Sequence, residues 1–411
     1  MLGSSRDRSV HGGRLLQRTN GTMKSSIQPP IQFLAVCGAA VAITTGCSQQ
    51  QPASDKPSGS AASTIPAIVK LDTIAQGLEV PWALAFAPDG RIFVTERPGR
   101  IRVVEKGVLR AEAWATLGVR ATGEAGLMGI ALAPDFARSH HVYVVGTFAV
   151  GEDDLVNRVV RFTDNDGRGG APKTIVDALP ASRFHSGDAV AFGPDGMLYV
   201  ATGDAQNPGD AQDRSSLAGK ILRYNPDGGI PADNPVRGSP IYALGLRNPQ
   251  GLAWDTQSGQ LFATDHGPSG FPNERLRRDR DELNAIVAGA NYGWPRVSGR
   301  NDDTRFVTPL VEWTPGIAPS GLALYSGSYA PWKNSAFVGA LKGEQLRRLV
   351  LERSATGWRI TGEAPLFTAE IGRIRAVAVG PEGHVYFTSS NRDGRGEVRR
   401  GDDKLFRIVT P

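Results

Sequence analysis

Six copies of one short pattern run through the body of the chain, and they constrain the fold more than any other feature. Each copy contains an alanine inside an apolar run, and a second β-rich run with an aromatic residue follows it. The alanines are Ala85, Ala131, Ala191, Ala253, Ala323 and Ala378, and the aromatic residues are Phe93, Tyr143, Tyr199, Phe262, Phe337 and Tyr386. Turn sequences such as Pro88-Asp89-Gly90 separate several of these runs. Each copy therefore predicts a β-hairpin.

A third β-rich run follows each hairpin, at residues 101–104, 159–162, 221–224, near 283, 346–350 and 405–408. Repeats of this length built from antiparallel strands are typical of β-propeller blades. A linear stack would leave strand edges exposed, whereas radial closure packs each blade against its neighbours. We predict an all-β, six-bladed β-propeller with four-stranded antiparallel blades, in which the repeated alanines and aromatic residues are packing residues.

One additional strand is expected before the first repeat, at residues 68–74. It has no hairpin partner of its own in the sequence. We expect it to pair with the last blade, next to the strand that ends near Ile408, and so to close the ring.

The composition is consistent with many short strands and limits which binding partners and metal ligands the protein can have. The 50 Gly and 28 Pro among 411 residues are too many for a mainly helical protein, because both residues break element interiors. The net charge is +5, but Lys and Arg form no long block and acidic residues lie among them, so we predict no nucleic-acid partner. The two cysteines, Cys37 and Cys47, both precede the repeats. Any metal in the repeat region must therefore use oxygen or nitrogen ligands.

The first 47 residues have the pattern of an export signal. Residues 31–45 form an apolar stretch of small residues that follows Lys24 and is too short to span a membrane. Thr45-Gly46-Cys47 is similar to a bacterial lipobox, which predicts a lipid on Cys47; plain secretion is the alternative. We therefore expect a leader over 1–47, a flexible tether over 48–67, and the propeller over 68–411, in an exported, periplasmic and membrane-anchored protein.

Polar residues gather at corresponding ends of the predicted hairpins. In an antiparallel hairpin the start of the first strand and the end of the second lie at the same end. Six hairpins around an axis would therefore bring these positions to one pocket. The residues before the first strands are Glu124, His185, Arg247, Asn248, Arg373 and Arg375, and those after the second strands include Glu96, Arg97, Asp204, 265–268 and Lys342.

The charges in this set indicate the chemistry of the pocket. The cations Arg247, Lys342, Arg373 and Arg375 would repel one another unless an anionic ligand lay between them, and Arg suits carboxylate binding. His185 is expected to be the one histidine at this mouth. Because imidazole titrates near neutral pH, His185 is the candidate general base.

Several ordered motifs from residue 78 to the C-terminus resemble the pyrroloquinoline quinone (PQQ)-dependent glucose/sorbosone dehydrogenases, and most closely the soluble aldose sugar dehydrogenases among them. The motifs are Gly219-Lys220-Ile221-Leu222-Arg223, Gly245-Leu246-Arg247-Asn248-Pro249-Gln250-Gly251, Asp265-His266-Gly267-Pro268, Asn291-Tyr292-Gly293-Trp294-Pro295 and Gly339-Ala340-Leu341-Lys342-Gly343. The resemblance implies oxidation of the anomeric hydroxyl of aldose sugars to lactones, with hydride passing to the quinone.

The resemblance also implies a role for each matching residue. His185 would be the catalytic base, with Arg247 and Asp204 beside it. The cofactor would be held by Glu124, Arg247, Asn248, Lys342, Arg373 and Arg375. Backbone carbonyls of Gly267 and Pro268 would bind a calcium ion at the quinone, which suits a cation that prefers oxygen ligands. A second, structural calcium is implied near Glu282 and Tyr292.

Two departures from the family pattern leave the substrate open. Phe184 precedes His185 where polar residues are common, and Ser186-Gly187-Asp188 follows it in place of the usual stretch. Residues 269–280 form a longer and more basic connection than the shortest family members have. We expect this insertion either to reshape the rim or contact an electron acceptor, or to be a tolerated surface insertion.

Two other functions are compatible with a six-bladed propeller, because fold does not determine function. One is a calcium-dependent lactonase, although hydrolysis gives no reason for four converging cations. The other is a non-catalytic binding propeller that presents its rim to a protein or glycan. As a dehydrogenase, the protein would take a sugar as substrate and pass electrons to a quinone or a cytochrome.

Overall fold

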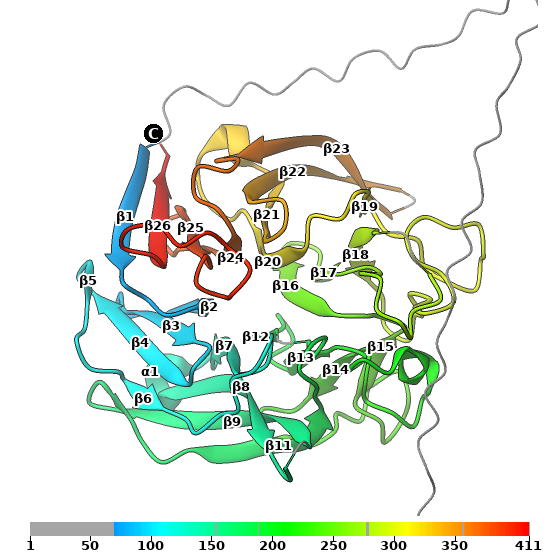
Figure 1. Ribbon diagram of the computed structural model, residues 1–411, viewed down its shortest axis with the longest axis horizontal. Helices are drawn as coiled ribbons and strands as arrows, with labels where there is room; N and C mark the ends of the chain where they lie inside the picture. Colours follow the sequence, from blue (N-terminus) through cyan, green and yellow to red (C-terminus); the bar gives the residue numbers. More distant parts are fainter. Residues whose placement is uncertain (1–69, 153, 188, 277–278, 356, 411) are drawn as a thin grey trace, which may run out of the picture. The chain divides into compact units, whose positions relative to one another are not determined.

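The computed structural model describes residues 70–410 except for 153, 188, 277, 278 and 356. Over these residues the strands form six antiparallel sheets arranged around a central axis (Figure 1). The predicted six-bladed β-propeller is confirmed. The expected leader over 1–47 and tether over 48–67 lie outside the described residues.

The first three blades follow the chain order from the innermost strand outward. Blade one contains β2 (Pro81–Phe86), β3 (Ile92–Glu96), β4 (Arg100–Glu105), β5 (Val108–Leu109) and β6 (Ala115–Thr116). Blade two contains β7 (Leu127–Leu132), β8 (His141–Ala149), β9 (Leu155–Asn165), β10 (Arg168–Gly169) and β11 (Lys173–Pro180). Blade three contains β12 (Val190–Phe192), β13 (Leu198–Thr202), β14 (Lys220–Tyr224) and β15 (Ile241–Leu244).

The remaining blades repeat this arrangement. Blade four contains β16 (Pro249–Asp255), β17 (Gln260–Asp265), β18 (Asp281–Ile286) and β19 (Val311–Trp313). Blade five contains β20 (Pro319–Leu324), β21 (Ser335–Ala340), β22 (Gln345–Ser354) and β23 (Gly357–Leu366). Blade six contains β24 (Ile374–Val379), β25 (Val385–Ser389), β26 (Lys404–Val409) and β1 (Lys70–Gln76).

Helical turns are short and lie between strands: α1 (Phe136–Ser139) and the 3₁₀ turns η1 (Pro208–Gln212) and η2 (Ala330–Trp332). Within the described part of the chain, no helix has the length and hydropathy needed to cross a membrane.

The repeated alanines and aromatic residues form one recurring cross-strand pair. In every blade the alanine of the innermost strand lies directly opposite the aromatic residue of the next strand. The pairs are Ala85 with Phe93, Ala131 with Tyr143, Ala191 with Tyr199, Ala253 with Phe262, Ala323 with Phe337, and Ala378 with Tyr386. A small residue at the crowded centre of the ring, facing a large one, is consistent with a packing role for both.

The first and last parts of the described chain close the ring. Strand β1 pairs antiparallel with β26, with Leu71 opposite Ile408 and Thr73 opposite Phe406. The innermost strands contact their neighbours in sequence, and β24 contacts β2. The expected closing strand is therefore confirmed, although it begins at Lys70 within the described residues and extends to Gln76.

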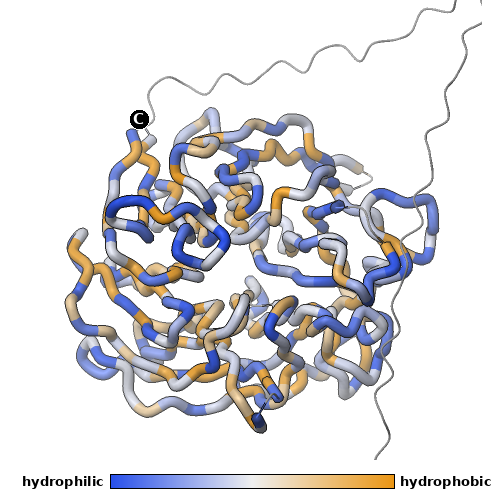
Figure 2. The backbone as a smooth tube through the Cα atoms, viewed as in Figure 1, coloured by the Kyte–Doolittle hydropathy of each residue, from blue (hydrophilic) through white to orange (hydrophobic). Residues whose placement is uncertain are grey.

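The apolar core is divided among the junctions between blades. One cluster joins blades six and one through residues such as Leu78, Val94 and Leu405, and other clusters join the remaining neighbours in turn. Many of the blade strands are hydrophobic, whereas several of the connecting loops are hydrophilic (Figure 2). Rigid blades thus hold the loops at their ends in fixed positions, which allows polar side chains from distant segments to meet.

Candidate active site

His185 lies just before β12, at one end of the ring, among the polar residues Asp204, Arg247 and Glu124. Its side chain is buried, and its backbone has a φ of 56°, in the left-handed region. Its Nδ1 is 2.9 Å from Oδ1 of Asp204, and its Nε2 is 2.8 Å from Nη2 of Arg247. Because a carboxylate only accepts hydrogen bonds and a guanidinium only donates them, Nδ1 carries the hydrogen, and the lone pair of Nε2 accepts the N–H of Arg247.

Asp204 is held in place by three donors. Besides His185, the indole Nε1 of Trp294 donates to its Oδ2 at 2.8 Å, and the backbone N–H of Gln206 donates to its Oδ1 at 2.9 Å. Asp204 is fully buried at the end of β13. The carboxylate therefore fixes both the orientation and the tautomer of the His185 imidazole.

Arg247 approaches the other side of His185 and is almost fully buried. Its Nη2 lies 2.6 Å from Oε1 of Glu274, and its Nη1 donates to the carbonyl of His266 at 3.2 Å. The ring of Trp294 lies beneath the guanidinium, 5.5 Å from its Cζ. The side chain is therefore restrained on several sides.

The backbone that carries Arg247 and Asn248 is fixed by Asp265 at the end of β17. The carboxylate of Asp265 accepts the N–H of Arg247 at 3.0 Å and that of Asn248 at 2.7 Å. Burial and the neighbouring Glu282 raise the pKa of Asp265 to about 8. Asp265 is thus a structural residue of the site, although the sequence pattern placed it only near the mouth.

Glu124 and Asn248 meet on the same side of His185. Oε2 of Glu124 accepts both the backbone N–H of His185 and the amide of Asn248, each at 3.2 Å. Burial alone would raise the pKa of Glu124, but the charges of His266, His185, Arg395 and Arg375 lower it to about 2. Glu124 is therefore an anion at the pH of the cell.

The other predicted cations also lie at this end, but they are paired within the protein. The expectation that they require an external anion to avoid repulsion needs correction, because protein carboxylates already neutralise most of them. The ion pairs are Arg247 with Glu274, Arg373 with Asp393, and Lys342 with Asp279. The Lys342 side chain is 58% exposed and therefore belongs to the rim.

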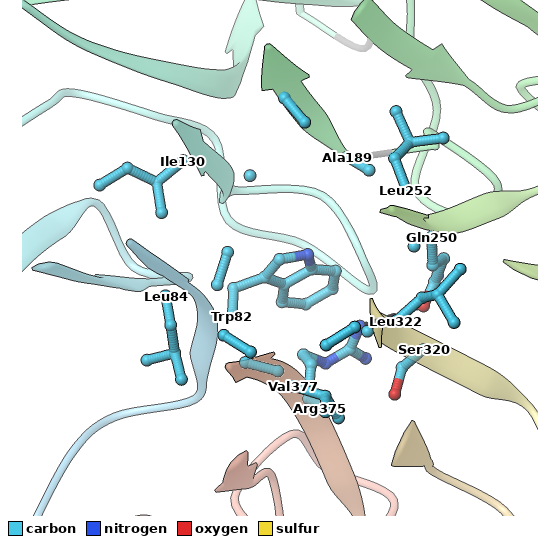
Figure 3. Close-up of a pocket in the computed structure, with 18 of the residues that line it drawn as sticks. Trp82, Leu84, Ile130, Ala189, Gln250, Leu252, Ser320, Leu322, Arg375 and Val377 are labelled. Carbon is cyan, nitrogen blue, oxygen red and sulfur yellow. Dashed lines mark hydrogen bonds between the residues drawn. The ribbon is translucent and has the colours of Figure 1, made fainter. Parts of the chain in front are cut away.

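Arg375 lies between two cavities. Its guanidinium is 3.5 Å from the ring centre of Trp82 and donates to Gln250 at 3.2 Å. On one side is the central channel, a cavity of 290 Å³ lined by the innermost strands. Figure 3 shows the Trp82 indole lying across this channel with Arg375 beside it. Arg375 and Trp82 therefore separate the channel from the polar end of the ring.

On the other side is a cavity of 240 Å³ beside Phe184 and Glu124. Its charged lining residues are the cations Arg97, Arg183, Arg375 and Arg395 and the anions Glu124 and Asp393. The cavity is lined by four cations and two anions, and the ion pair of Arg395 with Glu124 does not remove this excess of positive charge. The buried Nε of Arg97 has no hydrogen-bond partner among the described residues. The cavity is therefore suited to an anionic ligand that offers additional acceptors.

The residues predicted to bind calcium lie close to this group. Gly267 and Pro268 are buried just beyond the end of β17, and a side chain at Gly267 would clash with the carbonyl oxygen of Arg280. Glycine is therefore required there. Within the described ranges, no three His, Cys, Asp or Glu side chains are placed to hold a metal ion; the carboxylate beside Gly267 is that of Asp281, which accepts the N–H of Gly267 at 2.8 Å.

Glu282 lies in β18, opposite Asp265 of β17, and Tyr292 follows that strand in the sequence. Burial raises the pKa of Glu282, and Asp281 and Glu312 add to that rise. Its neighbour Asn284 has a buried side-chain oxygen without a hydrogen-bond partner among the described residues. The Tyr292 hydroxyl donates to the carbonyl of Ala285 and accepts the N–H of Val287, so its backbone carbonyl is the group that could bind a cation.

Sequence reasoning missed several members of the site. His266 was expected near the mouth within 265–268, but its role was missed, and the expectation that His185 is the one histidine there is wrong. The Nε2 of His266 donates to the carbonyl of Pro319, and burial lowers the pKa of His266 to about 4. Trp294 lies within a motif that drew attention, yet its contact with Asp204 depends on the tertiary structure. Glu274 and Phe271 lie in the insertion, and the alternative of a tolerated surface insertion is wrong, since Glu274 is buried against Arg247.

Comparisons with known proteins point to one family. The family model for Glucose / Sorbosone dehydrogenase matches residues 78–400. The chain is 31% identical to the aldose sugar dehydrogenase YliI of Escherichia coli K12, covering 80% of this chain and 92% of that protein. It is 29% identical to quinoprotein glucose dehydrogenase B of Acinetobacter calcoaceticus, covering 81% of this chain and 87% of that protein.

A solved structure agrees with these matches. The PQQ-bound form of aldose sugar dehydrogenase from Streptomyces coelicolor superposes with a TM-score of 0.72 at 38% identity, covering 84% of this chain and 98% of that one.

Proposed function

Since this chain belongs to the glucose/sorbosone dehydrogenase family, we propose that its site oxidises the anomeric hydroxyl of aldose sugars to lactones with His185 as the base. The protein is a PQQ-dependent sugar dehydrogenase. The observation that carries the proposal is the hydrogen-bonded row Asp204, His185 and Arg247, buried at the mouth of the propeller.

His185 is suited to take the proton of the sugar hydroxyl. Asp204 holds Nδ1–H, so Nε2 would take the proton once the sugar hydroxyl replaces the N–H of Arg247 there, and Asp204 stabilises the imidazolium that forms. Bound PQQ would supply the acceptor for the hydride that leaves the anomeric carbon. Loss of that hydride and of the hydroxyl proton converts the cyclic sugar into its lactone.

The donor set fits a flat polyanion such as PQQ. Arg373 and Arg375 are buried, Arg97 has a buried N–H without a partner among the described residues, and the cavity carries more cations than anions. Arg247, Asn248, Arg373 and Arg375 would hold carboxylates and carbonyls of the cofactor, with Lys342 at the rim. Glu124 would contact the cofactor while orienting Asn248.

Calcium is part of the same proposal. The carbonyls of Gly267 and Pro268 would bind a calcium ion beside the cofactor, where a hard cation polarises a carbonyl oxygen. A second calcium would bind near Glu282 and the backbone of Tyr292. The raised pKa of Glu282 and the unpartnered oxygen of Asn284 support this site. A bound cation would stabilise the ionised Glu282 carboxylate and would give the Asn284 oxygen a partner.

Reconstitution tests the function directly. Apo protein would be mixed with PQQ and calcium and then given a panel of aldoses, while the bound chromophore and the reduction of an acceptor dye are followed. We expect a bound chromophore and sugar-dependent dye reduction with formation of the lactone. Lactone hydrolysis without dye reduction would instead support a lactonase, and neither activity would support a binding propeller.

Two variants separate the base from a cofactor contact. His185→Gln should keep PQQ affinity while turnover falls by roughly 10²-fold to 10⁴-fold, the usual contribution of a general base. Lys342→Ala should weaken PQQ affinity by roughly 10-fold, because an exposed cation contributes at the lower end of a charge-assisted hydrogen bond. PQQ titrations and single-turnover reduction would measure both. Loss of PQQ binding in His185→Gln with normal chemistry in the remaining holoenzyme would contradict these roles.

Export and electron transfer complete the proposal. The lipobox-like Cys47, outside the described residues, would carry lipid and anchor a periplasmic enzyme, and a quinone or a cytochrome would accept its electrons. Mass spectrometry of the protein from bacterial membranes should show a mature chain that begins at a lipid-modified Cys47. An unprocessed leader in the same fraction would rule this out.

A further inference from the structure

The insertion between Pro268 and β18 contributes a buried carboxylate to the site. Glu274 is 3% exposed, although its neighbours Asn273 and Arg275 are exposed. Its Oε2 accepts three backbone N–H groups, from Ser269 at 2.9 Å, Gly270 at 2.8 Å and Phe271 at 3.1 Å. The segment is therefore folded around this carboxylate.

The other oxygen of Glu274 faces Arg247. Oε1 accepts from Nε of Arg247 at 2.7 Å and lies 2.6 Å from Nη2. The same Nη2 reaches Nε2 of His185 at 2.8 Å. Glu274 thus both neutralises the guanidinium and determines where its Nη2 lies relative to the nitrogen that takes the proton.

We propose that Glu274 is a positioning residue that acts through Arg247 on the imidazole of His185. The proposal rests on the proposed role of His185 as the base. A carboxylate is costly to bury unless it is paired, and here its partner is a residue of the active site. Holding Arg247 before the sugar arrives removes the need to order it during the reaction.

Charge also matters at this position. The charged groups around His185 are Asp204 at Nδ1 and Arg247 at Nε2. Its backbone N–H donates to Glu124, and that carboxylate is paired with Arg395. Without Glu274 the positive charge of Arg247 would be unbalanced beside Nε2. A nearby cation disfavours protonation of an imidazole, so the imidazole would stay unprotonated to lower pH and would be a weaker base for the sugar hydroxyl.

The first measurement needs neither cofactor nor sugar. Apo protein labelled with ¹⁵N-histidine would be compared by NMR as wild type, Glu274→Gln and the control Glu352→Gln, with His185→Gln to assign the signal. Glu352 pairs with Arg359 on an exposed hairpin. We expect the His185 ring signals to shift in Glu274→Gln and not in the control. Unchanged signals in Glu274→Gln would overturn the proposal, even if the enzyme proves not to oxidise sugars.

Kinetics at saturating PQQ give the second measurement. We expect kcat/KM of Glu274→Gln to fall about 10-fold to 100-fold, the effect of misplacing a catalytic group, and the acid limb of its pH profile to move to lower pH. A purely structural role would reduce the active fraction and leave the pH profile unchanged, and that result would overturn the proposal. Wild-type protein that fails to bind PQQ or oxidise sugar would contradict the proposed function instead.

A conservative variant covers the case in which Glu274→Gln does not fold. Glu274→Asp keeps the charge but withdraws the carboxylate by one methylene. We expect its turnover to fall while the acid limb stays in place, because the charge of Arg247 remains balanced. Wild-type turnover in Glu274→Asp would show that the position of Arg247 does not depend on Glu274.

A different contact in the same segment points to the sugar site. The ring of Phe271 meets the His185 imidazole edge to face, with centroids 5.0 Å apart, and lies 5.8 Å from Phe184. Both phenylalanines are half-buried. We also propose, resting on the proposed oxidation of sugars at His185, that Phe271 and Phe184 form the apolar wall of the sugar site, so that Phe271 limits the size of the sugar that reaches Nε2 of His185.

A sugar panel tests this wall. Phe271→Ala should raise KM for monosaccharides several-fold and increase the relative kcat/KM for disaccharides, because a buried apolar contact is lost and space is gained. PQQ affinity should not change. Pro272→Ala, at the exposed neighbouring position, serves as the control. An equal change for all sugars in Phe271→Ala would overturn the assignment.

Discussion

At the scale of single residues, the site is a set of charges balanced before any ligand arrives. Arg247 faces Glu274, Arg373 faces Asp393, and Glu124 faces Arg395. In the first two pairs both side chains are buried, so removing one member leaves its partner buried and uncompensated, which costs more than the pair itself contributes. These pairs should therefore influence stability as well as function.

Glu124 provides a test with a defined pH dependence. Its pKa is lowered from 4.5 in the unfolded chain to about 2, so its ionised form stabilises the fold fully above about pH 4.5. This contribution is lost as the pH falls from 4.5 towards 2. We expect Glu124→Gln apo protein to be less stable at pH 7 by about 1.5 to 3 kcal/mol, the usual contribution of hydrogen bonds to a charged group, and the difference to shrink near pH 3. Urea unfolding at both pH values would measure it; a difference independent of pH would contradict the charge argument.

At the scale of elements, the hairpin of each blade determines which residues reach the mouth. Pro249 pairs with Asp265 in blade four, and Ile374 pairs with Ser389 in blade six. The loops just beyond such pairs carry Arg247, His266 and Arg373. Because strand register fixes these ends, loop residues far apart in the sequence meet at reproducible distances.

The closing strand β1 is the element whose removal is most informative. A shortened chain that begins at Gly77 would lack the outer strand of blade six and expose the edge of β26. We expect it to lose at least about 3 kcal/mol of stability, since buried side chains such as Ala75 no longer pack, and to aggregate through the free edge. Thermal unfolding and light scattering would measure both effects.

The matched control for this deletion is a chain that begins at Lys70, which removes residues 1–69 and keeps β1. It should keep the unfolding temperature of the full chain. Equal stability of the two shortened chains would show that β1 does not close the ring in solution.

At the scale of the whole molecule, ligand binding and folding are linked through the ring. The proposed ligands of the calcium beside the cofactor follow β17, whereas the proposed cofactor ligands come from blades two, four, five and six. A ligand that contacts several blades binds only the closed ring and therefore stabilises it.

The binding of calcium and the binding of PQQ should accordingly strengthen each other. Gly267 and Pro268 offer neutral carbonyls, so tight calcium binding there should require the anionic oxygens of PQQ. Calorimetry would be done on Glu282→Gln, which removes the proposed second site. We expect calcium affinity to increase markedly once PQQ is bound, and the two ligands together to raise Tm by more than the sum of each alone. Equal calcium affinity with and without PQQ would contradict this geometry.

The sequence by itself determined the six-bladed architecture and the end of the propeller at which the site lies. The alanine and aromatic repeats predicted six hairpins, and residues 68–74 predicted the closing strand, because a two-residue period and turn chemistry are local properties. Hairpin geometry then placed His185, Asp204, Arg247 and Arg375 at one mouth. These predictions required no knowledge of how individual side chains pair.

Only the tertiary structure decided which partners these residues have. Glu274 to Arg247, Trp294 to Asp204 and Asp279 to Lys342 each join loops of irregular sequence. Such loops have no periodicity that fixes where a side chain points. Their contacts depend on the distances between blade ends, and those distances exist only once the ring has closed.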